Sequence, residues 1–282
     1  MTNTRIIGGI KLNGKQLRLA RLINPATNRC SIVPIDHGTT FGPIDGLKDY
    51  ICLTNKIIDG GADAIIMHKG LLRAVAKYPK LARGKYIMHL SASTMLNSDP
   101  TNKVLVSSVE EAIKLGADGV SVQVNLGVPT ESNMIKDLGM VSKACLEWGM
   151  PLLVMIYSHS NTRDAAHEAR VAEELGADIV KINYPGSAEK VEQVVKGVNI
   201  PVLIAGGNKL NVTEELFIMI NNALNSGASG IAIGRNIFQY EDPQLITSLV
   251  SKLVHGIFKI EECLFQLKRY NVSIKVCPEG SL

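Results

Sequence analysis

One short pattern recurs four times along the chain and constrains its fold more than any other feature. A Gly-Ala pair is followed each time by a short apolar run, with the glycines at positions 61, 116, 176 and 227. The spacings of 55, 60 and 51 residues match about two strand–helix units each. A glycine suits the end of a helix, where a positive φ is required, and the apolar run is typical of a buried strand. Four repeats therefore predict about eight strand–helix units.

Further apolar runs stand between the repeats and complete a series of eight predicted strands. All eight are nearly continuously apolar, as expected of parallel strands that are covered on both faces. Helical patterns separate them, and two of these patterns begin at expected N-caps, Asp164 and Thr213. The predicted strands cover residues 31–36, 64–68, 85–90, 119–124, 152–157, 178–183, 202–206 and 230–234.

Eight alternating units in 282 residues predict a single (β/α)8 TIM barrel, with an open doubly wound sheet as the alternative. The residues before Cys30 are expected to form an extra N-terminal helix, and residues 243–266 the last helix. No stretch has the composition of a linker, so we expect one barrel domain over residues 1–282.

Composition excludes several classes of protein. The apolar stretches are far shorter than the ~18–20 residues of a membrane helix, and the N-terminus has no signal-peptide core, so we expect a cytoplasmic protein without membrane contact. The net charge of +4 carries no long basic run, which suits an anionic small molecule and gives no reason to expect nucleic acid. Five scattered cysteines without a CxxC pair argue against a disulfide framework or structural zinc.

Chemistry in a barrel of this kind lies at the carboxyl ends of the strands. Lys181 lies inside the predicted strand 178–183, where its side chain points either into the barrel or toward the helices. A lysine in an apolar interior favours its neutral amine, which can attack a carbonyl and form a Schiff base. The alternative is an ammonium that pairs with a carboxylate or binds a substrate phosphate.

Two other strand ends carry groups that can move protons. Asp36 follows the first strand and is a candidate general base or a partner that holds the lysine, with capping of the next loop as the alternative. Tyr157 ends the fifth strand and is a candidate proton donor, or a tyrosine of the barrel rim.

A phosphate site is predicted after strands seven and eight. Gly206 and Gly207 follow the seventh strand, and Gly234 and Arg235 follow the eighth. Glycines allow backbone N–H groups to approach a phosphate closely, and these two loops hold phosphate in many barrels. The arginine adds a charged fork suited to phosphate oxygens. Tight turns with a surface arginine are the alternative.

Three histidines fall at the ends of the first three strands: His37, His68 and His89. A divalent metal site is one interpretation, but the spacing matches no metal motif. Hydrogen bonds to substrate or backbone are the other interpretation.

Several segments resemble the bacterial and archaeal class I aldolases of the DeoC/fructose-bisphosphate aldolase (DhnA-type) group. Within that group they are most similar to the enzymes that make 2-amino-3,7-dideoxy-threo-hept-6-ulosonate and to related aldolases that use aspartate semialdehyde. The resemblance runs over residues 32–243. Its segments are VPIDHGTTFGPIDGL, GGADAIIMHKG, HLSAST, LGMVSKACLEWGMPLLVMIY, ADIVKINYPG, PVLIAGGNK and ASGIAIGRNIFQYEDP.

The resemblance implies roles for particular residues. Lys181 matches the Schiff-base lysine, Tyr157 the proton donor and Asp36 the acid/base beside the imine. It also implies no metal and no cofactor, and a homo-oligomer, often a ring-type decamer. The donor-phosphate site would be Gly206, Gly207, Gly234 and Arg235, and further substrate contacts are expected from His37, Gly38, Thr39, Thr40, Ser158 and His159.

The chain departs from the group beside the expected acceptor site. Ser158-His159-Ser160 stands where a Pro-Arg-Gly type sequence is common, although Arg163 follows soon after. We therefore expect a Schiff-base aldolase or transaldolase that joins a phosphorylated ketone to L-aspartate semialdehyde. The donor is dihydroxyacetone phosphate or a 6-deoxy-5-ketohexose 1-phosphate. The alternatives are a class I fructose-bisphosphate aldolase and a phosphate-binding barrel without catalysis, which would have no need of a buried lysine.

Overall fold

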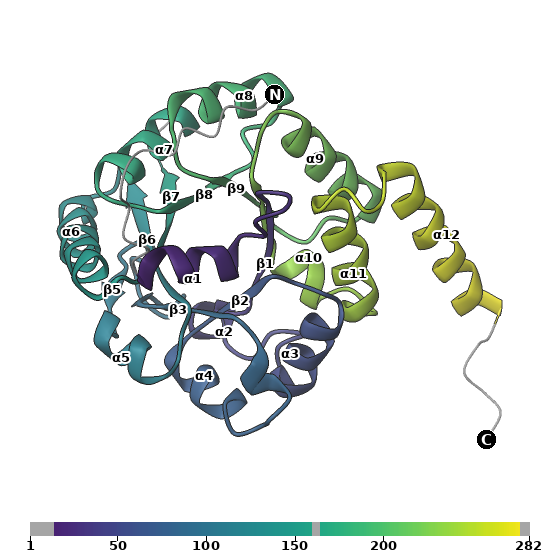
Figure 1. Ribbon diagram of the computed structural model, residues 1–282, viewed down its shortest axis with the longest axis horizontal. Coiled ribbons are helices and arrows are strands. Elements are labelled where there is room, and N and C mark those ends of the chain that lie inside the picture. The colour runs from purple at the N-terminus through teal and green to yellow at the C-terminus, as the bar shows by residue number, and fades with distance from the viewer. Residues whose placement is uncertain (1–13, 160–163, 277–282) are drawn as a thin grey trace.

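Eight parallel strands close into a barrel in the computed structural model, which describes residues 14–159 and 164–276. The order around the barrel is β1-β10-β9-β8-β7-β6-β3-β2, and helices surround it (Figure 1). This closure confirms the (β/α)8 prediction and excludes the open sheet. The strands agree with the predicted ones to within two residues at each end: β1 (Cys30–Pro34), β2 (Ala64–Met67), β3 (Tyr86–His89), β6 (Gly119–Leu126), β7 (Leu152–Ser158), β8 (Ile179–Asn183), β9 (Val202–Ala205) and β10 (Gly230–Ala232).

A small antiparallel ladder adds to the barrel between β3 and β6. It consists of β4 (Ser91–Ala92) and β5 (Val104–Leu105), and Ala92 pairs with Val104. The strands are too short to show a period in the sequence, so nothing predicted them. Their pairing brings residues 93–103 back over the carboxyl end of the barrel.

Helices cover the outside of the barrel, and most begin where the sequence indicates. The Asp164 side chain accepts hydrogen bonds from the N–H groups of Ala166 and His167, which confirms this N-cap. Thr213 is instead the first helical residue, after Val212. The main helices are α3 (Tyr50–Asp59), α4 (Lys69–Val75), α5 (Val109–Lys114), α6 (Glu131–Trp148), α7 (Ala165–Glu174), α8 (Ala188–Gly197), α9 (Thr213–Asn225) and α11 (Pro243–Val254), with the 3-10 turn Leu81–Arg83 and the short helices α2 (His37–Phe41) and α10 (Arg235–Phe238).

The predicted last helix, 243–266, is wrong in one respect: the chain turns within it. Gly256 has a φ of 69° and follows the end of α11. A second helix, α12 (Ile260–Val276), then projects away from the barrel (Figure 1). A left-handed glycine satisfies the end of one helix and redirects the chain, so the apolar pattern alone does not reveal the break.

The four repeated glycines have the backbone conformation that the repeat predicts. Their φ values are 83°, 76°, 94° and 94° at Gly61, Gly116, Gly176 and Gly227. In the first three repeats the next residue but one is an aspartate that accepts a hydrogen bond from a strand N–H. The pairs are Asp63 with Ser31, Asp118 with Tyr86 and Asp178 with Leu152. The repeat therefore both ends a helix and ties that end to the adjacent strand.

Helix α1 (Gly14–Leu22) closes the amino end of the barrel, as Figure 1 shows. Lys15 and Arg21 form ion pairs of 2.9 Å with Asp178 and Asp118, two of the repeat aspartates. Leu22 is buried against the apolar side chains of the barrel interior. These contacts confirm the extra N-terminal helix and leave the carboxyl end of the barrel as the open one.

The barrel core has two layers. Side chains that point inward, such as Ile32, Ile87 and Leu203, form one cluster, and those that point outward pack against the helices in a second and larger cluster. Residues 1–13, 160–163 and 277–282 of the predicted domain, Ser160 and Arg163 among them, lie outside the described residues. In the part that is described, no helix has the length and apolar character needed to cross a membrane.

Candidate active site

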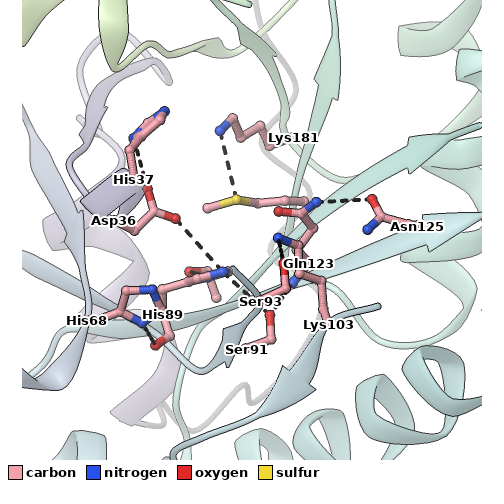
Figure 2. Close-up of polar contacts among 12 residues, drawn as sticks. Asp36, His37, His68, His89, Ser91, Ser93, Lys103, Gln123, Asn125 and Lys181 are labelled. Atoms are coloured by element: carbon pink, nitrogen blue, oxygen red, sulfur yellow. Dashed lines mark hydrogen bonds and ion pairs between the residues drawn. The ribbon is translucent and has the colours of Figure 1, made fainter. Parts of the chain in front are cut away.

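Strand alternation places Lys181 inside the barrel. Along β8, Val180 and Ile182 pack outward against the helices, whereas Ile179 belongs to the interior cluster. Lys181 therefore points inward one layer above Ile179, and it is only 7% exposed. Its Nζ lies 3.8 Å from the Met155 Sδ, and Figure 2 shows the Lys181 side chain among the other polar groups of the site. Of the two orientations open from the sequence, the structure selects the interior one.

A cavity of about 250 Å³ opens above this lysine at the carboxyl end of the barrel. It brings together most of the predicted site: Asp36, His37, Thr40, Tyr157, Lys181, Gly206, Gly207, Gly234 and Arg235. These residues come from the ends of β1, β7, β8, β9 and β10, which the sequence separates by up to two hundred positions. Closure of the barrel is what makes them neighbours.

Four predicted substrate contacts lie elsewhere. Gly38 and Thr39 are exposed on α2 and do not line the cavity. Ser158 and His159 line an adjoining hollow of about 280 Å³, which shares Thr40 and Tyr157 with the cavity. Apart from Gly38 and Thr39, the predicted contacts therefore divide between the cavity and an outer hollow beside it.

Asp36 stands at the start of α2 without capping it. Its side chain makes no hydrogen bond to the helix and turns instead toward the barrel interior. Its oxygens lie 3.4 Å from His37 Nδ1 and 3.8 Å from His89 Nε2. Burial opposes ionisation, but the nearby His89, His37 and Lys181 outweigh it and lower the pKa of Asp36 to about 2. The carboxylate is therefore ionised at neutral pH.

His89, at the end of β3, lies next to this carboxylate in the barrel interior. It is 3% exposed, and its Nδ1 lies 2.8 Å from Ser121 Oγ. Burial lowers the pKa of His89 to about 3, although the charge of Asp36 acts in the opposite direction. His68 lies beside it, with its ring 5.2 Å from that of His89 and its Nδ1 3.2 Å from the His89 carbonyl oxygen. Burial lowers the pKa of both rings, which favours their neutral forms. His68 contacts the backbone, as the second interpretation of the histidines expects, whereas His89 contacts a serine side chain.

The predicted phosphate side has the expected backbone features. Gly207 has a φ of 65°, and a Cβ at this position would meet no atom within 4 Å, so its backbone is open to a ligand. Arg235 begins α10 and lines the same cavity, with its guanidinium carbon 5.9 Å from the centre of the Phe41 ring. Its buried Nε has no hydrogen-bond partner among the described residues. An anion between these loops would supply one.

Sequence reasoning missed three polar residues of the cavity, Lys103, Gln123 and Asn183. Gln123 had a signal, because Ser121, Gln123 and Asn125 alternate with valines in β6 and so face the barrel interior together. Lys103 had none, because it lies in the segment that the β4–β5 ladder folds over the barrel. It is 8% exposed, and its Nζ donates a 2.5 Å hydrogen bond to Ser93 Oγ. Burial lowers the pKa of Lys103, while Asp36 raises it.

The charges of the cavity favour an anionic ligand. Among the described residues that line it, Lys103, Lys181 and Arg235 are basic and only Asp36 is acidic. Across the described ranges, no group of three or more His, Cys, Asp or Glu side chains is arranged to hold a metal ion. The cavity thus brings together an amine, an ionised carboxylate and a phenol, with the basic Arg235 at one wall.

Comparison with known proteins places this arrangement in a family. A model of the DeoC/LacD family aldolases matches residues 30–240. A 2-amino-4,5-dihydroxy-6-oxo-7-(phosphonooxy)heptanoate synthase of Streptomyces griseus is 40% identical over 250 residues, which cover 86% of this chain and 90% of the relative. The chain belongs to the DeoC/LacD family of aldolases.

Two further proteins extend the comparison. A 2-amino-3,7-dideoxy-D-threo-hept-6-ulosonate synthase of Archaeoglobus fulgidus is 38% identical to this aldolase over 255 residues, covering 89% of this chain and 95% of the relative. An archaeal fructose-1,6-bisphosphate aldolase, solved with its catalytic lysine bound to a carbinolamine intermediate, has a TM-score of 0.79 and 28% identity, covering 86% of this chain and all of that one. The protein is therefore an enzyme of the class I, Schiff-base type, and the predicted family resemblance is confirmed.

Proposed function

We propose that this aldolase joins a phosphorylated ketone to L-aspartate semialdehyde through an imine on Lys181. One observation carries the proposal: the buried Lys181 amine and the Gly207 and Arg235 anion site line the same cavity. A ketone whose phosphate occupies that site has its carbonyl within the same space as the amine. The donor is dihydroxyacetone phosphate or a 6-deoxy-5-ketohexose 1-phosphate, both of which carry the required phosphate.

The chemistry follows from an amine in this position. Lys181 attacks the donor carbonyl, and loss of water leaves an imine that withdraws electrons from the adjacent carbon. With dihydroxyacetone phosphate, removal of a proton from that carbon forms an enamine. With the ketohexose donor, the enamine forms instead when the bond between the two hydroxyl-bearing carbons breaks, and a three-carbon aldehyde leaves. The enamine then attacks the aldehyde carbon of the acceptor, whose oxygen takes up a proton. Hydrolysis of the new imine releases the product and regenerates the amine.

Asp36 and Tyr157 are the groups proposed to move these protons. The low pKa of Asp36 keeps it as a carboxylate at neutral pH, so it suits the base that accepts a proton or the charge that stabilises a protonated imine. Tyr157 lines both the cavity and the outer hollow. A phenol at that boundary suits the proton donor to the aldehyde oxygen.

The products named for two relatives support the acceptor. The Streptomyces product is a heptanoate with an amine on carbon 2, hydroxyls on carbons 4 and 5, a ketone on carbon 6 and a phosphate on carbon 7. An aldol bond between carbons 4 and 5 divides it into dihydroxyacetone phosphate and aspartate semialdehyde. The Archaeoglobus product has the same four-carbon amino-acid end. The two relatives thus differ in their donor half and share their acceptor half.

Trapping with borohydride tests the imine. Incubation with dihydroxyacetone phosphate and borohydride should leave a covalent adduct on Lys181, located by mass spectrometry of peptides. Lys181→Met should abolish the adduct, whereas Lys69→Met should retain it, since Lys69 binds Val106 O and Glu111 outside the cavity. Activity should also survive treatment with a chelator. An adduct at Lys69, or activity that a chelator removes, would refute the imine on Lys181.

Comparison of two substrates tests the acceptor against the glycolytic alternative. Fructose 1,6-bisphosphate requires a site for its second phosphate, and the described residues at the end of β7 provide Ser158 and His159 rather than an arginine. We expect its cleavage to be at least ~100-fold less efficient than condensation with aspartate semialdehyde. That ratio corresponds to roughly 2.7 kcal/mol, the size of one lost ionic contact. Equal kcat/KM values would make the enzyme a fructose-bisphosphate aldolase.

The homo-oligomeric state, with a ring-type decamer as its form, is part of the same proposal. Sedimentation of the purified protein tests it, and a monomer at micromolar concentration would contradict it. The absence of a cofactor stays a prediction that the chelator and dialysis of the enzyme address together.

A further inference from the structure

Lys103 is a buried cation, and the proposed reaction assigns it no role. It lines the same cavity as Lys181, yet it comes from the segment that joins β4 to β5. Figure 2 shows its side chain on the Gln123 and Ser93 side of the site, apart from Lys181. Its only hydrogen bond within the described residues is to the Ser93 hydroxyl. A buried ammonium is costly unless an anion or several acceptors surround it, so this one is poised for a charged ligand.

The position of Lys103 is fixed by its own segment. Ser93 Oγ donates to the Pro100 carbonyl oxygen at 2.6 Å, which orients the hydroxyl that accepts from Lys103. Asn125 on β6 donates to the Thr101 carbonyl oxygen at 2.5 Å and ties the segment to the barrel wall. The ammonium is therefore held in place before any substrate arrives, as a recognition group requires.

The order of the strands puts this ammonium across the cavity from the phosphate site. Arg235 follows β10, and Gln123, beside Lys103, lies on β6, which is four strands from β10 in the closed ring of eight. Lys181 lies on β8, midway between them. A donor bound by its phosphate at β9 and β10 and by its carbonyl carbon at Lys181 leaves the β6 wall for the acceptor.

We propose that Lys103 binds the carboxylate of the acceptor aldehyde and so selects an amino-acid semialdehyde. This inference rests on the proposed function and adds the residue that decides acceptor class. With dihydroxyacetone phosphate as donor, the two basic walls then hold the two ends of one product, phosphate at Arg235 and carboxylate at Lys103, with the new carbon–carbon bond near Lys181. The single ammonium of Lys103 suits a carboxylate, because it balances the one charge of that group, whereas a terminal phosphate dianion carries up to two.

The test compares two acceptors that differ only by this carboxylate. With dihydroxyacetone phosphate as donor, kcat/KM is measured for aspartate semialdehyde and for 3-aminopropanal, which is the same molecule without its carboxylate. The wild-type enzyme should prefer aspartate semialdehyde by about 10- to 150-fold, the factor of one charge-assisted hydrogen bond. Lys103→Met should lose that factor with aspartate semialdehyde and lose little with 3-aminopropanal.

Two controls separate recognition from other roles. Lys69→Met removes a lysine outside the cavity and should keep the preference. The borohydride adduct on Lys181 with donor alone should form equally in wild type and Lys103→Met, because the donor does not reach Lys103. The wild-type comparison needs no variant, so an absent preference overturns the inference even where Lys103→Met folds poorly.

Each contrary result has a distinct meaning. A wild-type enzyme that makes product with aspartate semialdehyde but shows no preference overturns this inference and leaves the proposed function standing. Equal losses with both acceptors, or a lost donor adduct, would assign Lys103 to the chemistry or the fold instead. A larger loss in fructose 1,6-bisphosphate cleavage would assign it to a phosphate. Formation of the Lys181 adduct without any product from aspartate semialdehyde would refute the acceptor and this inference together.

Discussion

Replacement of His89 by asparagine should make the aldolase less sensitive to acid. In the folded protein, burial lowers the pKa of His89 to about 3, against an ordinary value of 6.5. Between pH 3 and 6.5 the unfolded chain therefore binds a proton at this residue that the folded chain does not. Stability then rises with pH through this window, and it is lost as the pH falls.

The size of the effect follows from the proton balance. At pH 6 the unfolded histidine is about three-quarters protonated and at pH 5 almost fully so, whereas the folded one stays neutral at both. The free energy of unfolding should therefore fall by about 1 kcal/mol from pH 6 to pH 5 because of His89 alone. His37 and His68 also have lowered pKa values, mainly through burial. They add losses of the same sign that the variant keeps.

Denaturant unfolding at the two pH values measures this difference. Wild type, His89→Asn and His167→Asn are compared at one protein concentration, which removes effects of association. His167 is exposed on α7 and serves as the control. We expect the loss between pH 6 and pH 5 to be about 1 kcal/mol smaller in His89→Asn than in the other two proteins. The same loss in all three would show that His89 takes up a proton in the folded state, and the neutral support of Asp36 would be wrong.

Three more changes test other parts of the structure. Arg235→Ala should raise the donor KM by about 10- to 150-fold, since it removes a contact of roughly 1.5–3 kcal/mol, and an unchanged affinity for inorganic phosphate would put the phosphate site elsewhere. Tyr157→Phe should lower kcat for condensation by about 10²- to 10⁴-fold through loss of the proton donor, and a wild-type kcat would remove that role. Leu22→Ala should destabilise the protein by about 2–5 kcal/mol in denaturant unfolding, because it empties a buried site at the end of α1, and a loss below about 0.5 kcal/mol would show that α1 does not seal the barrel.

Local signals in the sequence determined the fold. A buried parallel strand needs a continuous apolar run, and a helix that ends tightly needs a residue at positive φ, so each unit is marked by its own few residues. The four Gly-Ala repeats count the units, and eight units predict a barrel, although only the closure of the sheet excludes the open alternative. The roles open to Lys181 and Arg235 also follow locally, because each stands beside a strand end whose place in a barrel is known in advance.

The sequence did not predict the site completely, because the direction of some side chains depends on residues far away in the chain. Gly38 and Thr39 adjoin Asp36 in sequence, yet α2 turns them outward and away from the cavity. The sequence analysis did not predict the break at Gly256, because α11 and α12 continue one apolar pattern on either side of a turn.

Only the tertiary structure decided the electrostatics and the far wall of the cavity. The low pKa of Asp36 depends on His89 and Lys181, which stand on β3 and β8. Lys103 carries no mark in the sequence, because it faces the cavity through a ladder of two short strands and a hydrogen bond from β6. Burial, charge pairing and the direction of a loop side chain are properties of the packed barrel. They arise when elements far apart in the chain meet, and the residues of one element alone do not encode them.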